Sequence, residues 1–316
     1  MTSTRPVALQ LCPFSQYLES ALKERCEVVR WWEFDAAAQR AWLVKHAASV
    51  RVVATGAQFG CSNELMAALP SLGIVSVNGV GIDKVDLAFA RSRGVRVGNT
   101  PGAPTIDTAD LAVGLVIDLL RGLPAADAYV RAGRWPKHGD MPLTKRVTGC
   151  TFGIVGLGSI GSAVAARLAP FGPILYTGPN RKPVDYTYEP DLLALSRKAD
   201  VLVVTCPANA ATRHLIGPAV FEALGPKSYL VNVSRGLVVD ETALAAALDA
   251  GTIAGAALDV YQNEPHVPEP LKQSPKTVLT PHMASGTVEG RKHMADMMLA
   301  NLDAFLAGSP LPTAVA

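Results

Sequence analysis

The sequence predicts an α/β fold made of two doubly wound parallel-sheet domains. Short runs rich in β-branched residues alternate with helical stretches along the chain, and this alternation is typical of parallel sheets covered by helices on both faces. A glycine-rich turn, Gly156-Leu-Gly-Ser-Ile-Gly161, lies between an apolar run and a helical stretch, which is the order that a dinucleotide-binding unit requires. The length of 316 residues is sufficient for two domains.

The first hundred residues contain the first series of elements. Strands are predicted at Val7–Leu11, Val28–Trp31, Val50–Ala54, Ile74–Val77 and Val95–Gly98. Helices are predicted between them at Gln39–His46, Glu64–Ala68 and Asp86–Arg93. Two prolines and a glycine in the segment Asn99–Pro104 interrupt both kinds of structure, so we place a domain boundary there.

A second series follows this boundary. We predict a helix over Asp107–Leu120 with Asp107 as its N-cap, and a loop over Arg134–Pro142. The predicted strands are Phe152–Val155, Ile174–Tyr176, Val201–Thr205, Tyr229–Val233, Ala256–Asp259 and Val278–Leu279. The predicted helices are Ser162–Ala169, Asp191–Lys198, Ala219–Ala223 and Glu241–Ala250, followed by a long final helix over Val288–Leu306. This pattern predicts a dinucleotide-binding domain of residues 101–286 inserted into a domain of residues 1–100 plus 287–316.

Composition argues against several classes of protein. With a formal net charge of +2, 18% charged and 49% hydrophobic residues, the chain is globular and carries no charge signal for a nucleic-acid partner. Its five cysteines are scattered without a C-x-x-C pair, which favours reduced thiols and gives no zinc spacing. The apolar run Val7–Leu11 is too short for a signal peptide, and Leu111–Leu120 is too short to cross a membrane. We therefore expect a cytoplasmic protein without a metal or a membrane partner.

The glycine turn is the candidate site for a dinucleotide. Gly156 makes the tight turn, Gly158 allows the backbone to approach a pyrophosphate, and Gly161 allows the helix and strand to pack closely. The N-terminus of the following helix offers free N–H groups and its dipole to the negative charge. A glycine-rich turn without a ligand is the alternative interpretation.

Three chemically active side chains, Arg235, Glu264 and His282, each follow a predicted strand of the second series. Ligands of open α/β sheets bind at the edge formed by the carboxyl ends of the strands. Arg235 can hold the carboxylate and polarise the carbonyl of a 2-oxo acid. His282 can supply a proton, and Glu264 beside it can favour the imidazolium. Each residue alone has a structural alternative (a salt bridge, a solvated charge or a structural histidine), but their joint position predicts a hydride-transfer site.

The first series supplies a candidate for binding the substrate carboxylate. Asn78-Gly79-Val80-Gly81 follows a strand and carries two glycines, so its backbone N–H groups can turn towards an anion. An ordinary turn between a strand and a helix is the alternative.

These segments together resemble the D-isomer-specific 2-hydroxyacid dehydrogenases. The likeness runs from about Val50 to the C-terminus and rests on Gly156–Gly161, Val231-Asn-Val-Ser-Arg-Gly236, Asp259-Val-Tyr-Gln-Asn-Glu-Pro265, Thr280-Pro-His282, Asn78-Gly-Val-Gly-Ile-Asp83 and Asn99-Thr-Pro101. A narrower likeness to the glyoxylate/hydroxypyruvate and hydroxyphenylpyruvate reductase branch rests on Arg131-Ala-Gly-Arg-Trp135, Leu143-Thr-Lys145 and His282–Arg291.

The resemblance implies a Rossmann dinucleotide-binding domain inserted in a flavodoxin-like substrate domain. It also implies catalysis by Arg235, Glu264 and His282, with His282 as the proton donor. It further implies a homodimer paired through the nucleotide-binding domain, in which the loop around Trp135 reaches the partner's active site in some members. The residues expected to bind the substrate are Asn78, Gly79, Val80, Gly81, Arg235 and His282. The residues expected to bind the cofactor are Gly156, Leu157, Gly158, Ser159, Ile160, Gly161, Asn180, Arg181, Lys182, Cys206, Pro207, Val233, Ser234, Asp259, His282 and Gly286.

The loop after the second strand of the nucleotide unit bears on which dinucleotide is used. NAD-preferring sites place an acidic residue there to bind the ribose 2′-hydroxyl. Here Tyr176-Thr177-Gly178 has no carboxylate, and Asn180, Arg181 and Lys182 follow, so two cations can pair with a 2′-phosphate. Asp185 and Glu189, further along, are the alternative acids. We predict that NADP(H) is preferred and that NAD(H) is also usable.

The predicted function is the NADPH-dependent reduction of small 2-oxo acids such as glyoxylate or hydroxypyruvate. Oxidation of a small anion such as phosphite is an alternative within the same architecture. Glu264 argues against the oxidation of formate, because the resemblance implies a glutamine as the partner of the histidine in formate-oxidising members. A nucleotide-sensing, corepressor-like binding protein is the alternative from another class, because such proteins keep the same catalytic residues.

Overall fold

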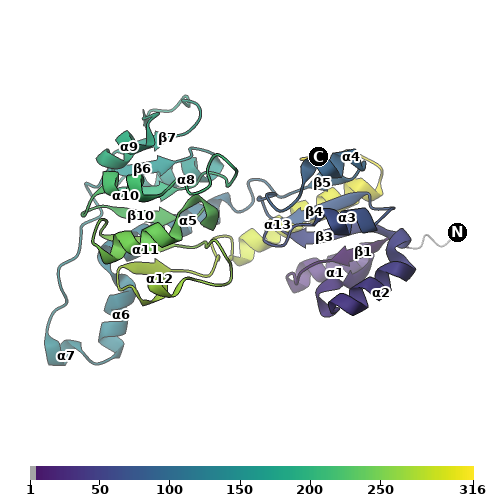
Figure 1. The fold of residues 1–316 in the computed structure, drawn as a ribbon, viewed down its shortest axis with the longest axis horizontal. Coiled ribbons are helices and arrows are strands. Elements are labelled where there is room, and N and C mark those ends of the chain that lie inside the picture. Colours follow the sequence, from purple (N-terminus) through teal and green to yellow (C-terminus); the bar gives the residue numbers. More distant parts are fainter. Residues whose placement is uncertain (1–4) are drawn as a thin grey trace. The chain divides into compact units, whose positions relative to one another are not determined.

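The computed structural model describes residues 5–316, and the chain divides into two compact units (Figure 1). The first unit comprises the chain up to Pro104 together with Gly286–Ala316, and the second comprises Thr105–Ser285. The sequence places these boundaries after residue 100 and after residue 286, so each differs from the structure by a few residues only. Each unit has its own parallel sheet and its own core.

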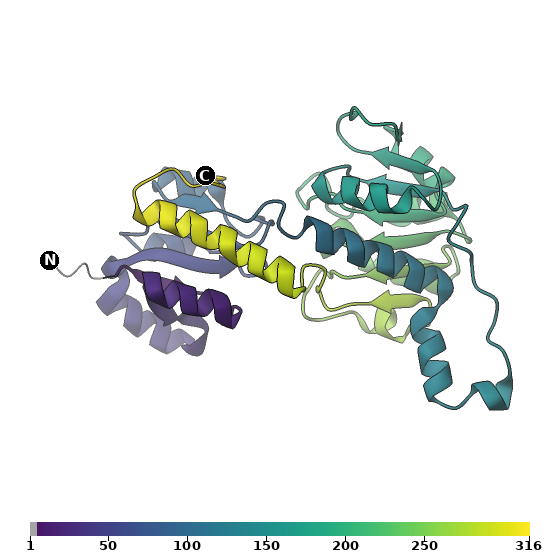
Figure 2. The ribbon, with the colours of Figure 1, turned by 180° about the vertical axis from the view of Figure 1, so that it is seen from behind.

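The sheet of the first unit has five parallel strands in the order β2-β1-β3-β4-β5. One face is covered by α1 (Gln16–Arg25) and α13 (Val288–Leu306), which lie side by side in Figure 2. The opposite face is covered by α2 (Ala36–His46), α3 (Asn63–Ala68) and α4 (Leu87–Ser92). The strands are β1 (Val7–Gln10), β2 (Glu27–Arg30), β3 (Val50–Gly56), β4 (Ile74–Asn78) and β5 (Arg96–Gly98).

Polar side chains begin the helices of the first unit. The side chains that accept a hydrogen bond from a first-turn N–H group are Ser15, Asp35, Ser62, Asp86 and Thr287. The prediction omitted α1, although its cap and its two buried leucines give it a helical signature. Two short 3-10 helices, η1 (Trp31–Glu33) and η2 (Ala47–Ser49), complete the unit.

The sheet of the second unit has seven parallel strands in the order β12-β11-β10-β9-β6-β7-β8. Helices α5 (Thr105–Arg121) and α8 (Ser159–Leu168) pack on one face. The other face packs against α9 (Leu192–Lys198), α10 (Pro218–Leu224) and α11 (Glu241–Asp249). The strands are β6 (Phe152–Val155), β7 (Ile174–Thr177), β8 (Thr187–Tyr188), β9 (Val201–Val204), β10 (Tyr229–Asn232), β11 (Gly255–Leu258) and β12 (Thr277–Leu279).

Strand β6 is the point at which the strand order of the second sheet reverses. It pairs with β7 on one side and with β9 on the other, and all these pairings are parallel. The glycine turn leaves the carboxyl end of this strand, which is where open α/β sheets bind their ligands. Because β10, β11 and β12 run parallel to β6, the segments that follow them emerge at the same edge.

Several predicted boundaries in the second unit are wrong. Helix α5 begins at Thr105, directly after Pro104, so Asp107 lies inside the first turn and is not the N-cap. Helix α8 begins at Ser159, three residues before the predicted Ser162 and within the glycine turn itself. The structure also contains β8, α12 (Glu269–Gln273) and the 3-10 helix η3 (Gly236–Val238), which the pattern did not indicate.

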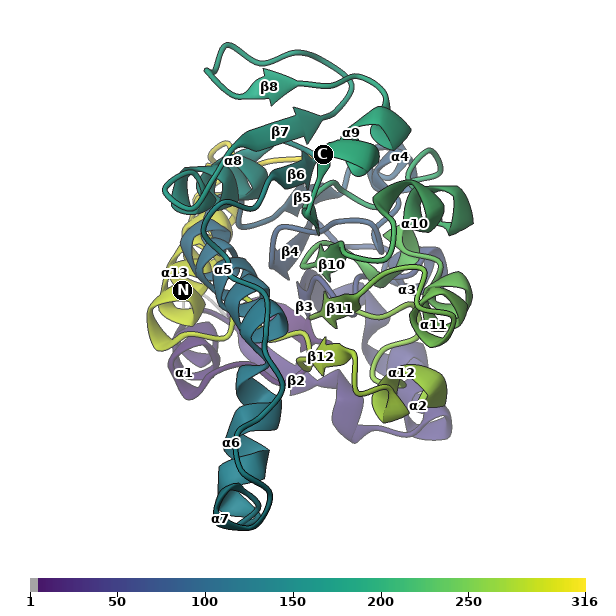
Figure 3. The ribbon, with the colours of Figure 1, turned by 90° about the vertical axis from the view of Figure 1, so that its left-hand side faces the viewer.

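An arm projects from the second unit where the sequence predicts no helix. It consists of α6 (Leu123–Arg131) and the one-turn α7 (Trp135–His138), and Figure 3 shows both extending away from the sheet of that unit. The predicted loop over Arg134–Pro142 is therefore partly helical. No residue of α6 is fully buried, and only Ala126 and Tyr129 are half-buried.

No helix within residues 5–316 combines the length and the apolarity that a membrane span requires. In the same part of the chain, no group of three or more His, Cys, Asp or Glu side chains is arranged to hold a metal ion.

Candidate active site

The glycine turn is closed by contacts that exclude larger residues at two of its three glycines. Gly156 has φ +97°, and a Cβ added there would lie 2.7 Å from the Cα of Cys206. A Cβ at Gly161 would lie 2.1 Å from the carbonyl oxygen of Gly156. These contacts hold the start of α8 directly against the end of β6, and they place the predicted Cys206 beside the turn.

Gly158 differs from the other two glycines of the turn because no contact within the protein requires a glycine at this position. A Cβ at this position would meet no atom within 4 Å, and Gly158 is the exposed N-cap of α8. The open space at a helix N-terminus fits the pyrophosphate of a dinucleotide, which needs close access to backbone N–H groups. The residues present thus fit the predicted cofactor.

The loop after β7 is held by two tyrosines of the same unit. The Tyr176 hydroxyl accepts a hydrogen bond of 2.7 Å from the Lys182 N–H, and the Tyr188 hydroxyl donates to the Gly178 carbonyl at 2.9 Å. The two rings lie 5.2 Å apart. Asn180, Arg181 and Lys182 are all exposed.

The two alternative acids of this region differ in their surroundings. Glu189 accepts a 2.6 Å hydrogen bond from Lys198, and this contact lowers the pKa of its carboxyl. Asp185 is exposed. Glu189 is therefore engaged by Lys198, whereas the exposed Arg181 and Lys182 have the charge to pair with a 2′-phosphate.

Glu264 and His282 form the closest pair of ionisable groups at this edge of the sheet. Glu264 Oε2 lies 2.7 Å from His282 Nδ1, and the two side chains are only 26% and 21% exposed. Burial alone raises the pKa of Glu264, but the hydrogen bond to His282, the Tyr261 N–H and the charges of His282 and Arg235 together lower it. The ionised carboxylate therefore accepts the Nδ1 proton, which leaves Nε2 to face a reacting group.

The loop that carries His282 is held by Asp259, whose side chain is fully buried. Its Oδ1 accepts hydrogen bonds from the Thr280 hydroxyl at 2.6 Å and from the Met283 N–H at 2.9 Å. Its Oδ2 accepts one from the Ala284 N–H at 3.0 Å. These bonds span His282, which has φ +50°, a left-handed conformation that costs energy for a residue with a side chain. Asp259 was predicted as a cofactor residue, and the structure shows its carboxylate engaged in shaping this loop.

Arg235 follows β10 and lies in a segment that packs against the Glu264 loop. Its Nη1 donates to the Ser234 carbonyl at 2.8 Å, and the Asn232 amide donates to the Arg235 carbonyl at 3.1 Å. A Cβ on the next residue, Gly236, would lie 1.9 Å from the carbonyl carbon of Tyr261. Only glycine therefore allows these two loops to approach so closely.

The other predicted cofactor residues follow the same strands with differing exposure. The Ser234 hydroxyl donates to Asn232 Oδ1 at 2.8 Å. Gly286 belongs to the first unit rather than the dinucleotide-binding one, because the chain leaves the second unit after Ser285. Ser159 and Pro207 are exposed, Ile160 is half-buried, and Leu157, Cys206, Val233 and Ser234 are buried.

The loop Asn78–Gly81 lies in the first unit, after β4. Gly79 has φ +151°, and a Cβ there would lie 2.5 Å from the Ala57 side chain. The Thr100 N–H donates to the Gly79 carbonyl at 2.9 Å and the Asn99 amide donates to the Val80 carbonyl at 2.8 Å. The buried Asn78 Oδ1 and Thr100 Oγ1 have no hydrogen-bond partner among residues 5–316. A fixed backbone beside unpartnered polar atoms fits a small polar ligand.

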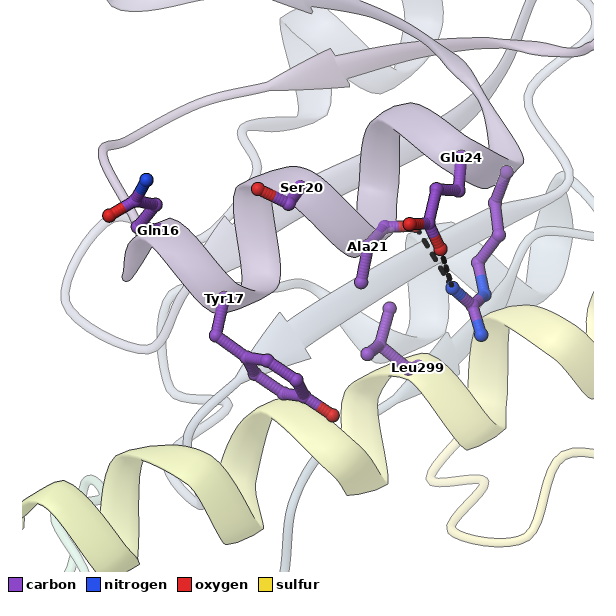
Figure 4. Close-up of a pocket in the computed structure, with 7 residues that line it drawn as sticks. Gln16, Tyr17, Ser20, Ala21, Glu24 and Leu299 are labelled. Atoms are coloured by element: carbon purple, nitrogen blue, oxygen red, sulfur yellow. Dashed lines mark hydrogen bonds and ion pairs between the residues drawn. The ribbon is translucent and has the colours of Figure 1, made fainter.

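A hollow of about 550 Å³ between α1 and α13 contributes nothing to these sites. Figure 4 shows Tyr17 directed towards α13. Glu24 forms an ion pair with the neighbouring Arg25. Its lining includes none of the predicted catalytic, substrate or cofactor residues.

Comparison with known proteins identifies the family. The model of the D-isomer specific 2-hydroxyacid dehydrogenase NAD binding domain matches residues 113–284. The chain belongs to the D-isomer-specific 2-hydroxyacid dehydrogenases. Membership confirms the resemblance and the fold class, and it makes the protein an NAD(P)-dependent oxidoreductase.

Three relatives illustrate where this dehydrogenase lies within the family. A hydroxyphenylpyruvate reductase of Plectranthus scutellarioides is 47% identical over 97% of this chain and 98% of its own length. A 2-hydroxyacid dehydrogenase of Ketogulonicigenium vulgare has a structure with TM-score 0.93 and 43% identity, covering 99% of both chains. The NADPH-dependent glyoxylate/hydroxypyruvate reductase of Sinorhizobium meliloti, solved with NADP and malonate, has TM-score 0.90 and 39% identity over 99% of this chain and 97% of its own.

Sequence patterns did not indicate three supports of the site. The hydrogen bonds of Asp259 to the His282 loop, the close approach at Gly236 and the contact between Glu241 and Gln262 all join segments about 20 residues or more apart. The only local signal is the glycine that follows Arg235.

Proposed function

We propose that this dehydrogenase reduces small 2-oxo acids to D-2-hydroxy acids with NADPH, using His282 as the proton donor. The observation that carries the proposal is the 2.7 Å hydrogen bond between His282 Nδ1 and an ionised Glu264. It fixes the ring so that Nε2 is the nitrogen available to donate a proton. A carboxylate beside the imidazole also stabilises the protonated ring that reduction consumes.

Arg235 has the chemistry to hold the substrate. A guanidinium carries a permanent charge and a planar set of donors, so it can bind a carboxylate and polarise the neighbouring carbonyl at once. Its charge also lowers the pKa of Glu264, which keeps that carboxylate ionised beside His282. In the first unit, backbone groups of Asn78–Gly81 are our candidates for binding a substrate carboxylate.

The second unit is the proposed dinucleotide-binding domain and the first the proposed substrate-binding domain. The turn Gly156–Gly161 would hold the pyrophosphate, and Arg181 with Lys182 would pair with the 2′-phosphate of NADPH. When bound, NADPH supplies the hydride. The Sinorhizobium reductase, solved with NADP, supports the choice of cofactor. NADH is expected to serve less well, because no carboxylate occupies the position that binds a free ribose hydroxyl.

A substrate panel tests the proposed function. Purified protein is given NADPH or NADH with glyoxylate, hydroxypyruvate and the bulkier hydroxyphenylpyruvate, and the consumption of reduced cofactor is followed. We expect turnover with at least one 2-oxo acid and a higher kcat/KM with NADPH. Turnover of phosphite with NADP⁺ but of no 2-oxo acid would favour the small-anion alternative. Cofactor binding without any turnover would favour a nucleotide-sensing protein.

We also propose a homodimer formed through the arm of the second unit. The arm exposes Leu123, Val130 and Trp135, and Leu143, shortly after the arm, is 102% exposed. Such an apolar set on a projecting segment is typical of an interaction site, and Trp135 is the residue that would approach the partner's active site. Val130→Asp is expected to give a monomer by analytical ultracentrifugation, whereas Val44→Asp, at an exposed valine of α2, should not. A monomeric wild type would refute the dimer.

The five cysteines are all free and buried, which supports our further proposal of a reducing, cytoplasmic location. Cell fractionation with a compartment-specific marker tests it, and recovery with a secreted or organellar fraction would refute it.

A further inference from the structure

We propose that Glu241 and Gln262 are positioning residues that hold the loop carrying Glu264 against the segment carrying Arg235. This proposal rests on the proposed function, because the positions of Glu264 and Arg235 matter only if they serve that reaction. It adds two residues to which neither the reaction chemistry nor the strand-end pattern assigns a role.

Gln262 is tied twice to the segment that follows Arg235. Its backbone N–H donates to Glu241 Oε1 at 2.6 Å, and its side-chain Nε2 donates to the Val239 carbonyl at 2.7 Å. Glu241 is 7% exposed and is the first residue of α11. The preceding Asp240 caps that helix by accepting from the Ala243 N–H at 3.0 Å. The acceptor for Gln262 is thus fixed on a rigid helix terminus.

These two bonds connect to the catalytic pair through one further residue. Tyr261, next to Gln262, donates its N–H to Glu264 Oε1 at 3.0 Å, and Glu264 Oε2 binds His282. The Tyr261 peptide also packs on the α-carbon of Gly236. Moving Gln262 away from Glu241 would therefore shift the carboxylate that orients His282 and loosen its packing against the Arg235 segment.

The charge of Glu241 does not explain its position. The pKa of its carboxyl is raised, mainly by burial and further by the negative charges of Glu264 and Asp240. The hydrogen bond from the Gln262 N–H and the nearby His214 act in the opposite direction. A buried carboxylate beside two others is unfavourable to the fold. What Glu241 contributes is a hydrogen-bond acceptor at a defined place, and glutamine can supply the same acceptor without the charge.

The first experiment compares Glu241→Ala with Glu241→Gln in the reductase assay. We expect the alanine variant to lose roughly 10- to 100-fold in kcat with KM for the 2-oxo acid changed less than about threefold, as for a misplaced catalytic group. The glutamine variant should remain within about threefold of wild-type kcat. Glu19→Ala is the matched control, because Glu19 is a half-buried carboxylate of the first unit that accepts the Phe14 N–H at 3.3 Å.

A second readout does not depend on activity. The proton between His282 Nδ1 and the Glu264 carboxylate should give a low-field imidazole N–H signal by NMR, identified by its absence in His282→Asn. We expect this signal in the wild type and in Glu241→Gln, and its loss or broadening in Glu241→Ala. Should Glu241→Ala fail to fold by circular dichroism, Gln262→Ala, which removes only the tie to Val239, should show a smaller loss of kcat and a shifted signal.

The outcomes separate the two proposals. Wild-type kcat and an unchanged imidazole signal in the alanine variants would overturn the positioning role, as would a glutamine variant as impaired as the alanine one. A wild type that turns over no 2-oxo acid, while Glu241→Ala still loses the signal, would refute the proposed function and leave the positioning role standing.

Discussion

Replacing Glu264 by glutamine keeps the size of the side chain and an oxygen that can accept the Nδ1 proton, but it removes the charge. Glu264 and His282 are 2.7 Å apart and each is about three-quarters buried, at 26% and 21% exposure, so solvent screens the pair only in part. A charge-assisted hydrogen bond of this kind contributes about 1.5 to 3 kcal/mol. Since about 1.4 kcal/mol corresponds to a factor of 10 in rate, losing the charge should slow a reaction that depends on this hydrogen bond roughly 10- to 100-fold.

The ionised Glu264 accepts the Nδ1 proton and so supports His282 as the proton donor in the reduction. In Glu264→Gln, kcat at about pH 8 should fall roughly 10- to 100-fold, and the loss should shrink as the pH falls through the lowered pKa of Glu264, where the wild-type carboxylate also loses its charge. The assay is NADPH consumption at saturating 2-oxo acid across this range. Glu189→Gln, which removes a half-buried carboxylate of the same unit that pairs with Lys198, is the control and should keep the wild-type profile. A loss that is equal at every pH would refute the reasoning.

The same carboxylate affects stability in a defined direction. The pKa of Glu264 is lower in the folded chain than its ordinary value, so the ionised group stabilises the fold above its unfolded pKa of about 4.3. This contribution is lost as the pH falls through the lower folded value. The difference in the free energy of unfolding between wild type and Glu264→Gln should therefore shrink below about pH 4, as measured by urea titration.

The remaining predictions concern the cofactor turn, the cofactor choice and the thiols. In Gly161→Ala the new Cβ would lie 2.1 Å from a carbonyl oxygen, so the free energy of unfolding should fall by about 1–3 kcal/mol or more. In Gly158→Ala the new Cβ would have no atom within 4 Å, so the variant should unfold as the wild type does but bind NADPH more weakly. The double substitution of Arg181 and Lys182 by alanine should weaken NADPH binding roughly 10- to 100-fold and leave NADH binding nearly unchanged; equal losses for both would contradict the 2′-phosphate assignment. Burial raises the pKa of the Cys12 and Cys206 thiols to about 11. At about pH 8 a thiol reagent should therefore modify them slowly in the native protein and rapidly in denaturant. Fast labelling of the native protein would contradict their burial.

Much of the architecture could be predicted because the informative residues are local. The apolar run Phe152–Val155 and the glycines after it form a strand, a turn and a helix within one short segment. Arg235, Glu264 and His282 each come soon after a strand, and parallel pairing then brings those ends to one edge. These regularities depend on sequence spacing, so they can be recognised without coordinates.

The features of the fold and the site that could not be predicted depend on contacts between distant segments or on weak local signals. The bond from Asp259 to the Ala284 N–H joins residues 25 positions apart, and nothing near either residue indicates it. Helix α6 carries apolar residues at helical spacing, Leu123, Ala126 and Val130, but none of them is fully buried, so the local signal is weak. Asp107 lies in the first turn of α5 and is not its N-cap, because the helix already begins at Thr105.

The most direct test of the account is the turnover of His282→Ala. With saturating NADPH and the best 2-oxo acid of the panel, kcat should fall roughly 100-fold or more if His282 donates the proton, while the NADPH dissociation constant from a fluorescence titration remains within about threefold of the wild type. Near wild-type turnover in His282→Ala would contradict the assignment of the proton donor and, with it, the mechanism proposed for this site.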